Sequence, residues 1–364
     1  MSIHDDSTTN PFEQARRLSV EVSRREALAT AAKLGLGGAA LAAALGAGDI
    51  PAAFAAGRAE ATLPKESYHF VFVNHVTTNP FFTPTQYGAA DASQLLGCSY
   101  AWTGSSTSNV SQMTQAMQTA VAGNAAGIAV SIIDPQAFNA PVASAVSKGI
   151  PVVSYNADAP TSSNNKRLAY IGQDLYAAGQ SMGQRIASEV ASGSRIVLFI
   201  ATPGSLNIQP RLDGAKAALH ASGKNYTIDT IATGALVVNE NSSVESYYLG
   251  HKSVKGMFAV DGGSTAAIAL ASKKYGLQTH GVSTGGFDLL PTTISGIHNG
   301  TMGFTIDQQP YLQGFYPVMQ LYLYKASNTL MFPSNTNTGL KFVTRGNVKP
   351  YLTNSRFEGT STSF

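Results

Sequence analysis

The chain has 364 residues, of which 44% are apolar and 12% are charged. A chain of this length and composition can bury a large core, which excludes a disordered protein and favours more than one lobe. The formal charge is only +3 and the basic residues are dispersed along the chain. We therefore expect no nucleic-acid partner, because such a surface gathers its Lys and Arg residues in patches or runs.

The first 55 residues have the order of an export signal. Arg24 and Arg25 precede a weakly apolar stretch rich in Gly and Ala, and an A-x-A cleavage pattern follows at 53–55. The paired arginines indicate the twin-arginine type, although Ala27 stands where that signal usually carries Phe. We expect residues 1–55 to be this signal and the mature protein to lie in the periplasm or outside the cell.

One alternative to a cleaved signal is a membrane anchor. Residues 28–47 are about long enough to cross a bilayer, but Gly and Ala dominate them and Leu is sparse. The single cysteine, Cys98, lies far past any cleavage site, so it serves neither as a lipid-anchor cysteine there nor as half of an internal disulfide. We expect Cys98 to be a small buried residue.

From Tyr68 onward, the sequence repeats a unit of about 30 residues, in which a short apolar run, a turn and a segment with helical spacing follow one another. The expected strands cover 69–73, 128–133, 150–155, 168–172, 195–201, 227–232, 256–260, 281–287 and 301–306. The expected helices begin at Thr83-Pro84 and near Val110, then cover 140–148, 175–190, 211–221, a poorly marked segment near Ser243, 265–275, 294–300 and 312–325.

This alternation predicts an α/β protein. Strands that are apolar on both faces and separated by helices indicate parallel sheets covered by helices. There are too many strands for one sheet of ordinary size, so two α/β lobes are expected. In open parallel sheets ligands bind outside the carboxyl ends of the strands, which makes the residues after each strand the candidates for a binding site.

Those residues are mostly carboxylates and carboxamides, with aromatic rings at two points. They are Asn79 with Phe81 and Phe82, Asp134, Asn156, Asp158, Asn207, Gln209, Asp261, Asp288 beside Phe287, and Gln308. Asp and Asn form paired hydrogen bonds to neighbouring hydroxyl groups, and aromatic faces cover the C–H surface of a sugar. The set predicts a polyhydroxy ligand.

Each candidate also has a purely structural interpretation. Asp134 and Asp288 could be helix N-caps, a common use of Asp after a strand. Phe81 and Phe82 could belong to the core, and Asn79 could only form the turn before a proline. The prediction depends on the convergence of the set.

Seven short motifs occur in order over residues 66–350: NPFF at 79–82, IIDP at 132–135, GIPVVSYN at 149–156, RLDG at 211–214, FAVD at 258–261, GGFD at 285–288 and TIDQQP at 305–310. With this ordered set the chain resembles a periplasmic sugar-binding protein of the ribose/galactose type, the solute-binding component of an ABC importer. The resemblance implies the type I periplasmic binding fold, with two similar lobes, each a parallel sheet flanked by helices.

The resemblance further implies that three crossovers join the lobes, near Ile171, Gln308 and Gly339, and that the lobes close on a ligand held between them. The implied N-terminal lobe is 66–171 plus 309–338, and the implied C-terminal lobe is 172–308 plus 339–356. The implied partner is an ABC permease with a separate ATPase, since the sequence lacks a P-loop pattern. A monomer without a cofactor or a metal is expected.

Transferred by position, the resemblance makes Phe81 and Phe82 stacking residues. It assigns hydroxyl contacts to Asn79, Asp134, Asn156, Gln209, Asp261, Asp288 and Gln308. Ribose-type members carry an arginine after the residue matching Asn156 and another at the position matching Gln209, but here those positions hold Ala157 and Gln209. Loss of both guanidinium groups predicts a neutral sugar or sugar alcohol other than ribose. A carboxylated sugar would need a cation in this cleft.

An enzyme is one competing prediction. Residues 262–266 resemble G-x-S-x-G with its last glycine replaced, and Asp288 and His298 follow in hydrolase order. His298 falls within an expected helix, however, and Ser264 is expected to be a helix N-cap. No catalytic residue is therefore expected.

Two further classes share parts of this pattern. A sugar-responsive transcription regulator can have two such lobes, but the N-terminal segment here has the order of an export signal and not of a basic helix-turn-helix. Docking of the closed protein on a chemoreceptor or sensor kinase stays open at this stage, because transport and sensing would use the same closed lobes. The seven histidines show no metal-ligand spacing.

Overall fold

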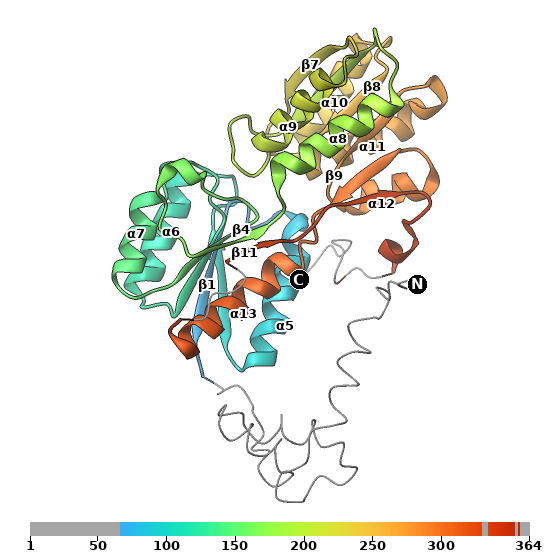
Figure 1. Ribbon diagram of the computed structural model, residues 1–364. Helices are drawn as coiled ribbons and strands as arrows, with labels where there is room; N and C mark the ends of the chain where they lie inside the picture. Colours follow the sequence, from blue (N-terminus) through green and yellow to red (C-terminus); the bar gives the residue numbers. More distant parts are fainter. Residues whose placement is uncertain (1–65, 330–333, 354–355, 357–364) are drawn as a thin grey trace, which may run out of the picture. The chain divides into compact units, whose positions relative to one another are not determined.

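A computed structural model describes residues 66–329, 334–353 and 356; the predicted export signal and the alternative anchor lie outside them. The described chain contains two six-stranded sheets, each flanked by helices (Figure 1). No helix among these residues has both the length and the apolar character needed to cross a bilayer.

The first sheet has the strand order β11-β5-β4-β3-β1-β2, and all of its neighbouring strands run parallel. Its strands are β1 His69–Asn74, β2 Ser99–Gly104, β3 Gly127–Val130, β4 Val152–Tyr155, β5 Ala169–Gly172 and β11 Asn335–Asn337. Helices α6 Val110–Ala122 and α7 Asn139–Ser147 cover one face, and α5 Thr83–Leu96 and α13 Leu312–Ser327 cover the other (Figure 1).

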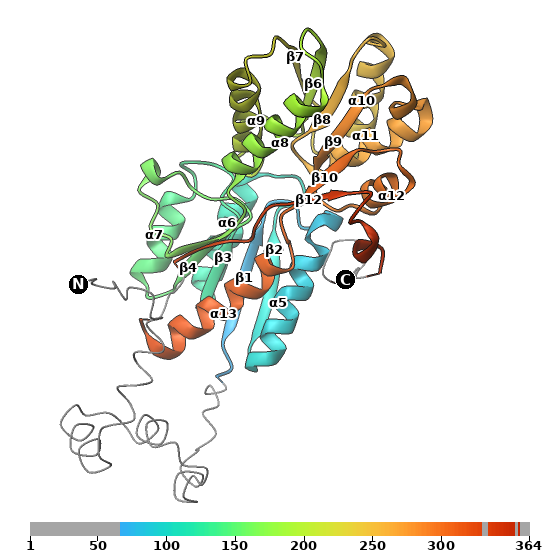
Figure 2. The same cartoon turned by 45° about the vertical axis from the view of Figure 1, so that its right-hand side comes forward.

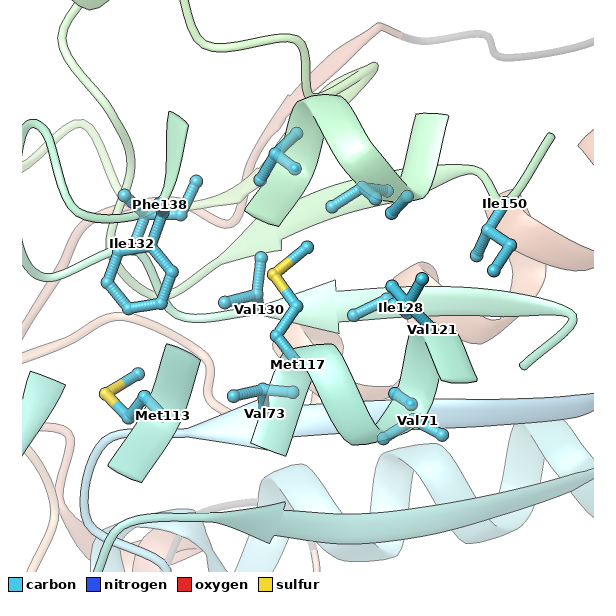
Figure 3. Close-up of a cluster of buried hydrophobic side chains, with 14 of the residues drawn as sticks. Val71, Val73, Met113, Met117, Val121, Ile128, Val130, Ile132, Phe138 and Ile150 are labelled. Carbon is cyan, nitrogen blue, oxygen red and sulfur yellow. The ribbon is translucent and has the colours of Figure 1, made fainter. Parts of the chain in front are cut away.

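Strand β1 supplies apolar side chains to both faces of this sheet. Val71 and Val73 pack in a cluster with Met113 and Met117 of α6, as Figure 3 shows. The intervening Phe70 and Phe72 belong to the cluster on the opposite face, with residues of α5 and α13. Because successive side chains of a strand alternate between faces, a run that is apolar throughout is the pattern of a strand buried on both sides.

The second sheet has the order β12-β10-β9-β8-β6-β7, and β12 is antiparallel to β10 whereas the other pairs are parallel. Its strands are β6 Arg195–Ile200, β7 Thr227–Ala232, β8 Gly256–Ala259, β9 Ser283–Phe287, β10 Phe304–Asp307 and β12 Lys341–Thr344. Helices α8 Leu175–Glu189 and α9 Gln209–Ala221 cover one face, α10 Val237–Gly250 and α11 Gly262–Tyr275 the other, and α12 Pro291–Asn299 packs beside α11 (Figure 2).

The chain passes between the two sheets three times. It leaves β5 for α8 through residues 173–174, returns from β10 to α13 through 308–311, and passes from β11 to β12 through 338–340. The predicted fold class, two α/β lobes joined by three crossovers, is confirmed.

Some local predictions differ from the structure. A 3-10 helix at Pro80–Phe82 precedes α5, so the N-cap of α5 is Phe82 and Thr83 is already its first residue. Asn79 caps this short helix, accepting a hydrogen bond from the Phe81 N–H at 2.9 Å. Strand β2 was not predicted, because its side chains are only half-buried and polar residues interrupt its apolar run. Cys98 is half-buried.

Glycines bring helix backbones into direct contact in both lobes. A Cβ on Gly314 of α13 would lie 1.8 Å from the Thr85 carbonyl oxygen of α5, and one on Gly88 would lie 2.0 Å from the Tyr311 carbonyl oxygen. A Cβ on Gly179 of α8 would lie 2.1 Å from the carbonyl oxygen of Arg211 in α9. At each of these three positions, a side chain larger than a hydrogen atom would push the paired helices apart.

We predict that Gly314→Ala destabilises the protein by about 1–3 kcal/mol, because the new methyl group overpacks a backbone contact that cannot yield without moving a helix. The measurement is urea unfolding followed by circular dichroism. Gly250→Ala is the matched control, since a Cβ there meets no atom within 4 Å. Equal stability of the two variants would contradict the assigned helix contact.

Candidate ligand-binding site

A cavity lined by residues of both lobes lies at the carboxyl ends of the strands. It encloses about 600 Å³ of empty space, part of which is open to solvent. Its lining includes Asn156 after β4, Asp261 after β8, Asp288 after β9 and Gln308 after β10. This is the edge at which a parallel α/β sheet is expected to bind ligands.

Seven of the nine residues predicted from the sequence line this cavity, so the structure brings most of that set into one place. They are Asn79, Phe81, Phe82, Asn156, Asp261, Asp288 and Gln308. Asp134 and Gln209 are not among the lining residues.

The side chains of Asp134 and Gln209 bond to their own local backbone or helix. The Asp134 carboxylate accepts the N–H groups of Gln136 and Ala137, each at 2.8 Å, as a cap of the turn after β3. Gln209 accepts the Gly204 N–H at 2.8 Å and donates to the carboxylate of Asp213 one helical turn later, also at 2.8 Å. Gln209 therefore occupies the first turn of α9 and its polar atoms are bonded there.

Phe81 and Phe82 belong to the core and also form part of the cavity wall. Their ring centroids are 4.7 Å apart at an interplanar angle of 82°, an edge-to-face pair. Both rings are buried within the cluster that includes Phe72 and Tyr155, and both line the cavity. The core interpretation of both rings is therefore confirmed, and their stacking against a ligand stays a prediction.

His75, which follows β1, links the two lobes. Its Nδ1 lies 2.9 Å from the Ser131 hydroxyl oxygen, and its Nε2 lies 3.2 Å from the amide nitrogen of Asn207, which follows β6. Burial lowers the pKa of His75 to about 4, so the ring is neutral at pH 7. With the Asn207 amide donating to Nε2, the ring proton lies on Nδ1 and is donated to Ser131.

Arg211 is the cation of the cavity, and the sequence analysis did not place one there. Its guanidinium donates to the Val260 carbonyl oxygen and to the Gln173 side-chain oxygen, each at 3.1 Å, and lies 4.2 Å from the centroid of the Phe287 ring. The side chain is almost completely buried, and its Nε has no hydrogen-bond partner within the described chain. Desolvation lowers its pKa, while the charge of Asp288 opposes that shift.

Two carboxyl groups face this cation from the second lobe. Asp288 has φ of +74°, a left-handed backbone that Asp tolerates, and its carboxylate accepts the Gln308 amide at 2.6 Å. Asp261 is the N-cap of α11 and accepts the N–H groups of Ser264 at 2.8 Å and Ala201 at 2.9 Å. Burial raises the pKa of both acids.

The N-cap role of Asp261 corrects the prediction made for Ser264. Ser264 lies within α11, is fully buried, and its hydroxyl is 2.8 Å from that of Thr233. Within the part of the chain that the structure describes, neither Ser264 nor Asp288 bonds to a histidine, so the arrangement of a hydrolase triad is absent there. Asp288 is not a helix cap either, because α12 begins after Leu290.

A chain of side-chain amides connects the cavity to the crossovers. Asn156 donates to the Gln313 carboxamide oxygen at 3.1 Å, and Gln313 donates to the Gln308 carboxamide oxygen at 3.0 Å. Gln308 then donates to Asp288, which completes a path from the first lobe to the second. Gln313 also lies 3.2 Å from the Thr338 hydroxyl in the third crossover.

The first crossover is tied to the same site through Gln173. Its side chain accepts from Arg211 and donates to the Gly339 carbonyl oxygen at 3.0 Å. All three crossovers therefore contribute hydrogen bonds to groups in or next to the cavity. Arg211 and Asp288 are therefore hydrogen-bonded to residues of two different crossovers, Gln173 and Gln308.

Three titratable lining residues were not predicted from the sequence: His75, Arg211 and Glu240. Arg211 stands in the RLDG motif, two residues beyond Gln209, and of these two residues the cavity lining includes only Arg211. Glu240 lies in the first turn of α10, where a carboxylate usually favours the helix dipole. No local pattern distinguishes it from a solvated first-turn residue. Within the described ranges, no group of three or more His, Cys, Asp or Glu side chains could hold a metal ion.

Two parallel-sheet lobes with a polar and aromatic cavity between them define a solute-binding protein. The chain belongs to the periplasmic binding protein domain family, whose model matches residues 70–328. The resemblance found in the sequence is thereby confirmed.

Two relatives are similar over most of their length. The xylose/arabinose-binding protein XylF of Sulfolobus acidocaldarius is 52% identical over 309 residues, which cover 82% of this chain and 76% of that protein. The ribose import binding protein RbsB of Haemophilus influenzae is 27% identical over 247 residues, 65% of this chain and 78% of that protein.

Solved structures show the same fold. A solute-binding protein of an ABC transporter from Burkholderia graminis, in complex with D-arabinose, superposes with a TM-score of 0.73 at 23% identity, over 79% of this chain and 99% of that one. A carbohydrate transporter from Acidothermus cellulolyticus, in complex with myo-inositol, superposes with a TM-score of 0.69 at 24% identity, over 78% and 96%. At this identity the likeness shows the fold alone.

The buried His75 predicts a specific loss of stability in acid. Its pKa of about 4 in the folded protein is below the ordinary value of 6.5, so the unfolded chain binds a proton that the folded chain does not. The contribution of neutral His75 to the free energy of unfolding is fully present above pH 6.5. It falls by up to about 3 kcal/mol as the pH decreases toward 4. Relative to wild type, His75→Gln should therefore lose less stability over this window.

Urea unfolding of both proteins between pH 4 and 8 measures this difference. His220→Gln is the matched control, since His220 lies exposed in the last turn of α9. Parallel pH profiles for wild type and His75→Gln would contradict the neutral, buried state of His75.

Proposed function

We propose that this chain captures a neutral monosaccharide, in particular an aldopentose of the xylose or arabinose type, and delivers it to an ABC importer. The observation that carries the proposal is the convergence of two fixed aromatic rings with carboxylates and carboxamides in one cavity between the lobes. The 52% identical relative, a xylose/arabinose-binding protein by name, supports the choice of pentose.

The proposed contacts follow from the groups left unpaired in the cavity. Asn79 uses its oxygen for Phe81 and leaves its NH₂ group without a partner among the described residues. Asn156 uses its NH₂ group for Gln313 and leaves its oxygen for a hydroxyl hydrogen. The outer surfaces of Phe81 and Phe82 would cover the C–H face of the sugar ring.

Arg211 changes the reason for expecting a neutral ligand. The sequence analysis excluded carboxylated sugars because it found no cation, but the cavity holds one. We propose that neighbouring carboxyl groups already balance this charge, since Asp288 and Asp261 both act electrostatically on Arg211. A uronic acid would add a further negative charge next to these acids, so a neutral sugar is still preferred.

Binding is proposed to shift the chain toward a closed arrangement of the lobes. Contacts from both lobes to one ligand exist together only when the lobes are close, so the ligand favours closure by the free energy of those extra contacts. The amides of Gln173, Gln308 and Gln313 at the crossovers would rearrange as the lobes move. The proposed lobe boundaries are 66–171 plus 309–338 and 172–308 plus 339–356.

The remaining assignments belong to the same proposal. Residues 1–55 would direct export by the twin-arginine route, and the mature protein would be a monomer without catalytic activity that docks on an ABC permease with a separate ATPase. Loss of pentose uptake on deletion of the gene, with pentose sensing intact, would separate transport from a sensing role.

Isothermal titration of the mature protein against D-xylose, L-arabinose, D-ribose, xylitol, myo-inositol and D-glucuronate tests the ligand class. We expect micromolar binding, about 8 kcal/mol, of one or two neutral pentoses and no binding of the uronic acid. Tight binding of D-glucuronate without binding of any neutral sugar or polyol would contradict the proposal.

We predict that Asp288→Asn weakens pentose binding by about 10- to 100-fold, because it replaces a buried carboxylate oxygen by an NH₂ group that cannot accept a ligand hydroxyl. Phe82→Leu should cost less, about three- to tenfold, since an apolar surface is retained. Asp134→Asn is the matched control outside the cavity lining and should bind as wild type. Equal affinities in all three variants would place the site elsewhere.

A further inference from the structure

Two acidic side chains in the cavity wall meet each other directly. Glu240 and Asp261 are both buried, with 4% and 7% of their surface exposed, and the charge of Asp261 together with a hydrogen bond to it raises the pKa of Glu240. Both line the cavity. Two ionised carboxylates have acceptors only, so this hydrogen bond requires that the pair hold one proton.

The geometry places that proton on Glu240. Asp261 accepts backbone N–H groups from Ser264 and Ala201, and both bonds stabilise its ionised form. The side-chain carboxyl group of Glu240 has no hydrogen-bond partner besides Asp261 in the described part of the chain. Burial and the charge of Asp261 raise the pKa of Glu240 to about 8, so Glu240 is the donor of the pair at neutral pH.

The absence of a side chain at Gly263 leaves room for the Glu240 carboxyl group. A Cβ on Gly263, in the first turn of α11, would lie 2.1 Å from both carboxyl oxygens of Glu240. The carboxyl group therefore lies flat against the α11 backbone, where any other residue would displace it. The packing of α10 against α11 therefore determines the position of the Glu240 carboxyl group.

No cationic side chain compensates Glu240 from the surrounding elements. From α11, the basic residues Lys273 and Lys274 lie in the last turn, at the opposite end of the helix from Gly263. The charge of Arg211 on α9 acts on Asp288 and Asp261 and is not among the causes of the Glu240 shift.

The other titratable groups near the cavity do not supply a cation either. His75, from the first lobe, is neutral. On α10 itself, Glu245 is paired with Lys274 at the surface. Ionisation of Glu240 would therefore place a second negative charge beside Asp261 without a counter-ion.

We propose that Glu240 is a further ligand-binding and specificity-determining residue, which acts as a neutral acid: it donates its proton to Asp261 and accepts a sugar hydroxyl hydrogen with its carbonyl oxygen. This inference rests on the proposed function. Glu240 lines the cavity and no described residue donates a side-chain hydrogen bond to it, so a hydroxyl group of the ligand can donate to its carbonyl oxygen. Glu240 would favour ligands with a hydroxyl group at this position over deoxy sugars.

Protonation of Glu240 makes the affinity for the sugar depend on pH. A bound sugar removes remaining water from the cavity and disfavours the ionised form of Glu240 further, so the ligand-bound protein holds the proton more tightly than the free protein. By linkage, affinity is constant below the pKa of the free protein and falls as pH rises through about 8. The loss approaches tenfold per pH unit for one proton.

Titration calorimetry with D-xylose and L-arabinose between pH 6 and 9.5 tests this inference. Wild type should weaken above about pH 8, whereas Glu240→Gln, whose amide can donate to Asp261 and accept from the ligand, should bind with a flat pH profile. Glu240→Ala should lose about tenfold in affinity at pH 6. Glu245→Gln, on the surface of the same helix, should follow the wild-type profile.

The outcomes separate the inference from the function on which it rests. A flat wild-type profile with intact pentose binding, or the same slope in Glu240→Gln as in wild type, would overturn the role of Glu240 and leave the proposed function standing. Absence of binding of every sugar at every pH would overturn both. Circular dichroism of each variant confirms folding, and Glu240→Gln keeps the test decisive if Glu240→Ala does not fold.

Discussion

The burial of one guanidinium group at the cavity wall, that of Arg211, constrains much of the site. A charge removed from water is costly unless it is paired and hydrogen-bonded, and Arg211 obtains its partners from separate parts of the chain. A strand end supplies the Val260 carbonyl, a crossover supplies Gln173, and β9 supplies the Phe287 ring. The glycine at position 179 lets α8 approach the Arg211 backbone closely enough for this arrangement. A substitution at any of these residues would alter the contacts of Arg211 and, through Arg211, the cavity wall.

The same physical requirement explains why the crossovers are rich in carboxamides. Buried polar atoms need partners, and the amides of Gln308 and Gln313 satisfy one another, Asp288 and Asn156 in one continuous path. A rigid, fully apolar hinge would resist rotation, whereas amides can exchange partners of similar energy. The polar wall of the cavity and the crossovers therefore belong to one hydrogen-bond network.

Most of the fold could be predicted from the sequence, because buried parallel strands appear in it as short continuous runs of apolar residues. The runs 70–73 and 196–201 are apolar throughout and lie in β1 and β6, and such a short continuous apolar run is the pattern expected of a strand covered on both faces. The edge strands β2 and β11 were not predicted, because β2 is half-buried, β11 spans only 335–337, and both include polar residues. Their places were determined by pairing with neighbouring strands, which is a tertiary property.

The site was predicted in part for a related reason. Residues immediately after strands, such as Asn156 and Asp288, are placed by the sheet itself and could be found by position. Arg211 and Glu240 lie one turn or less into helices, where a charged residue is usually solvated, and their burial depends on glycines of other helices. Asp134 shows the opposite error, because a carboxylate after a strand can satisfy its own turn.

A crystal structure of the protein with D-xylose or L-arabinose bound is the most direct test of the central claim. The account predicts a sugar between the lobes, with Phe81 and Phe82 against its C–H face and hydroxyl groups in contact with Arg211 and Asp288. A sugar bound outside this cavity, or a cavity that stays empty at saturating pentose, would contradict it.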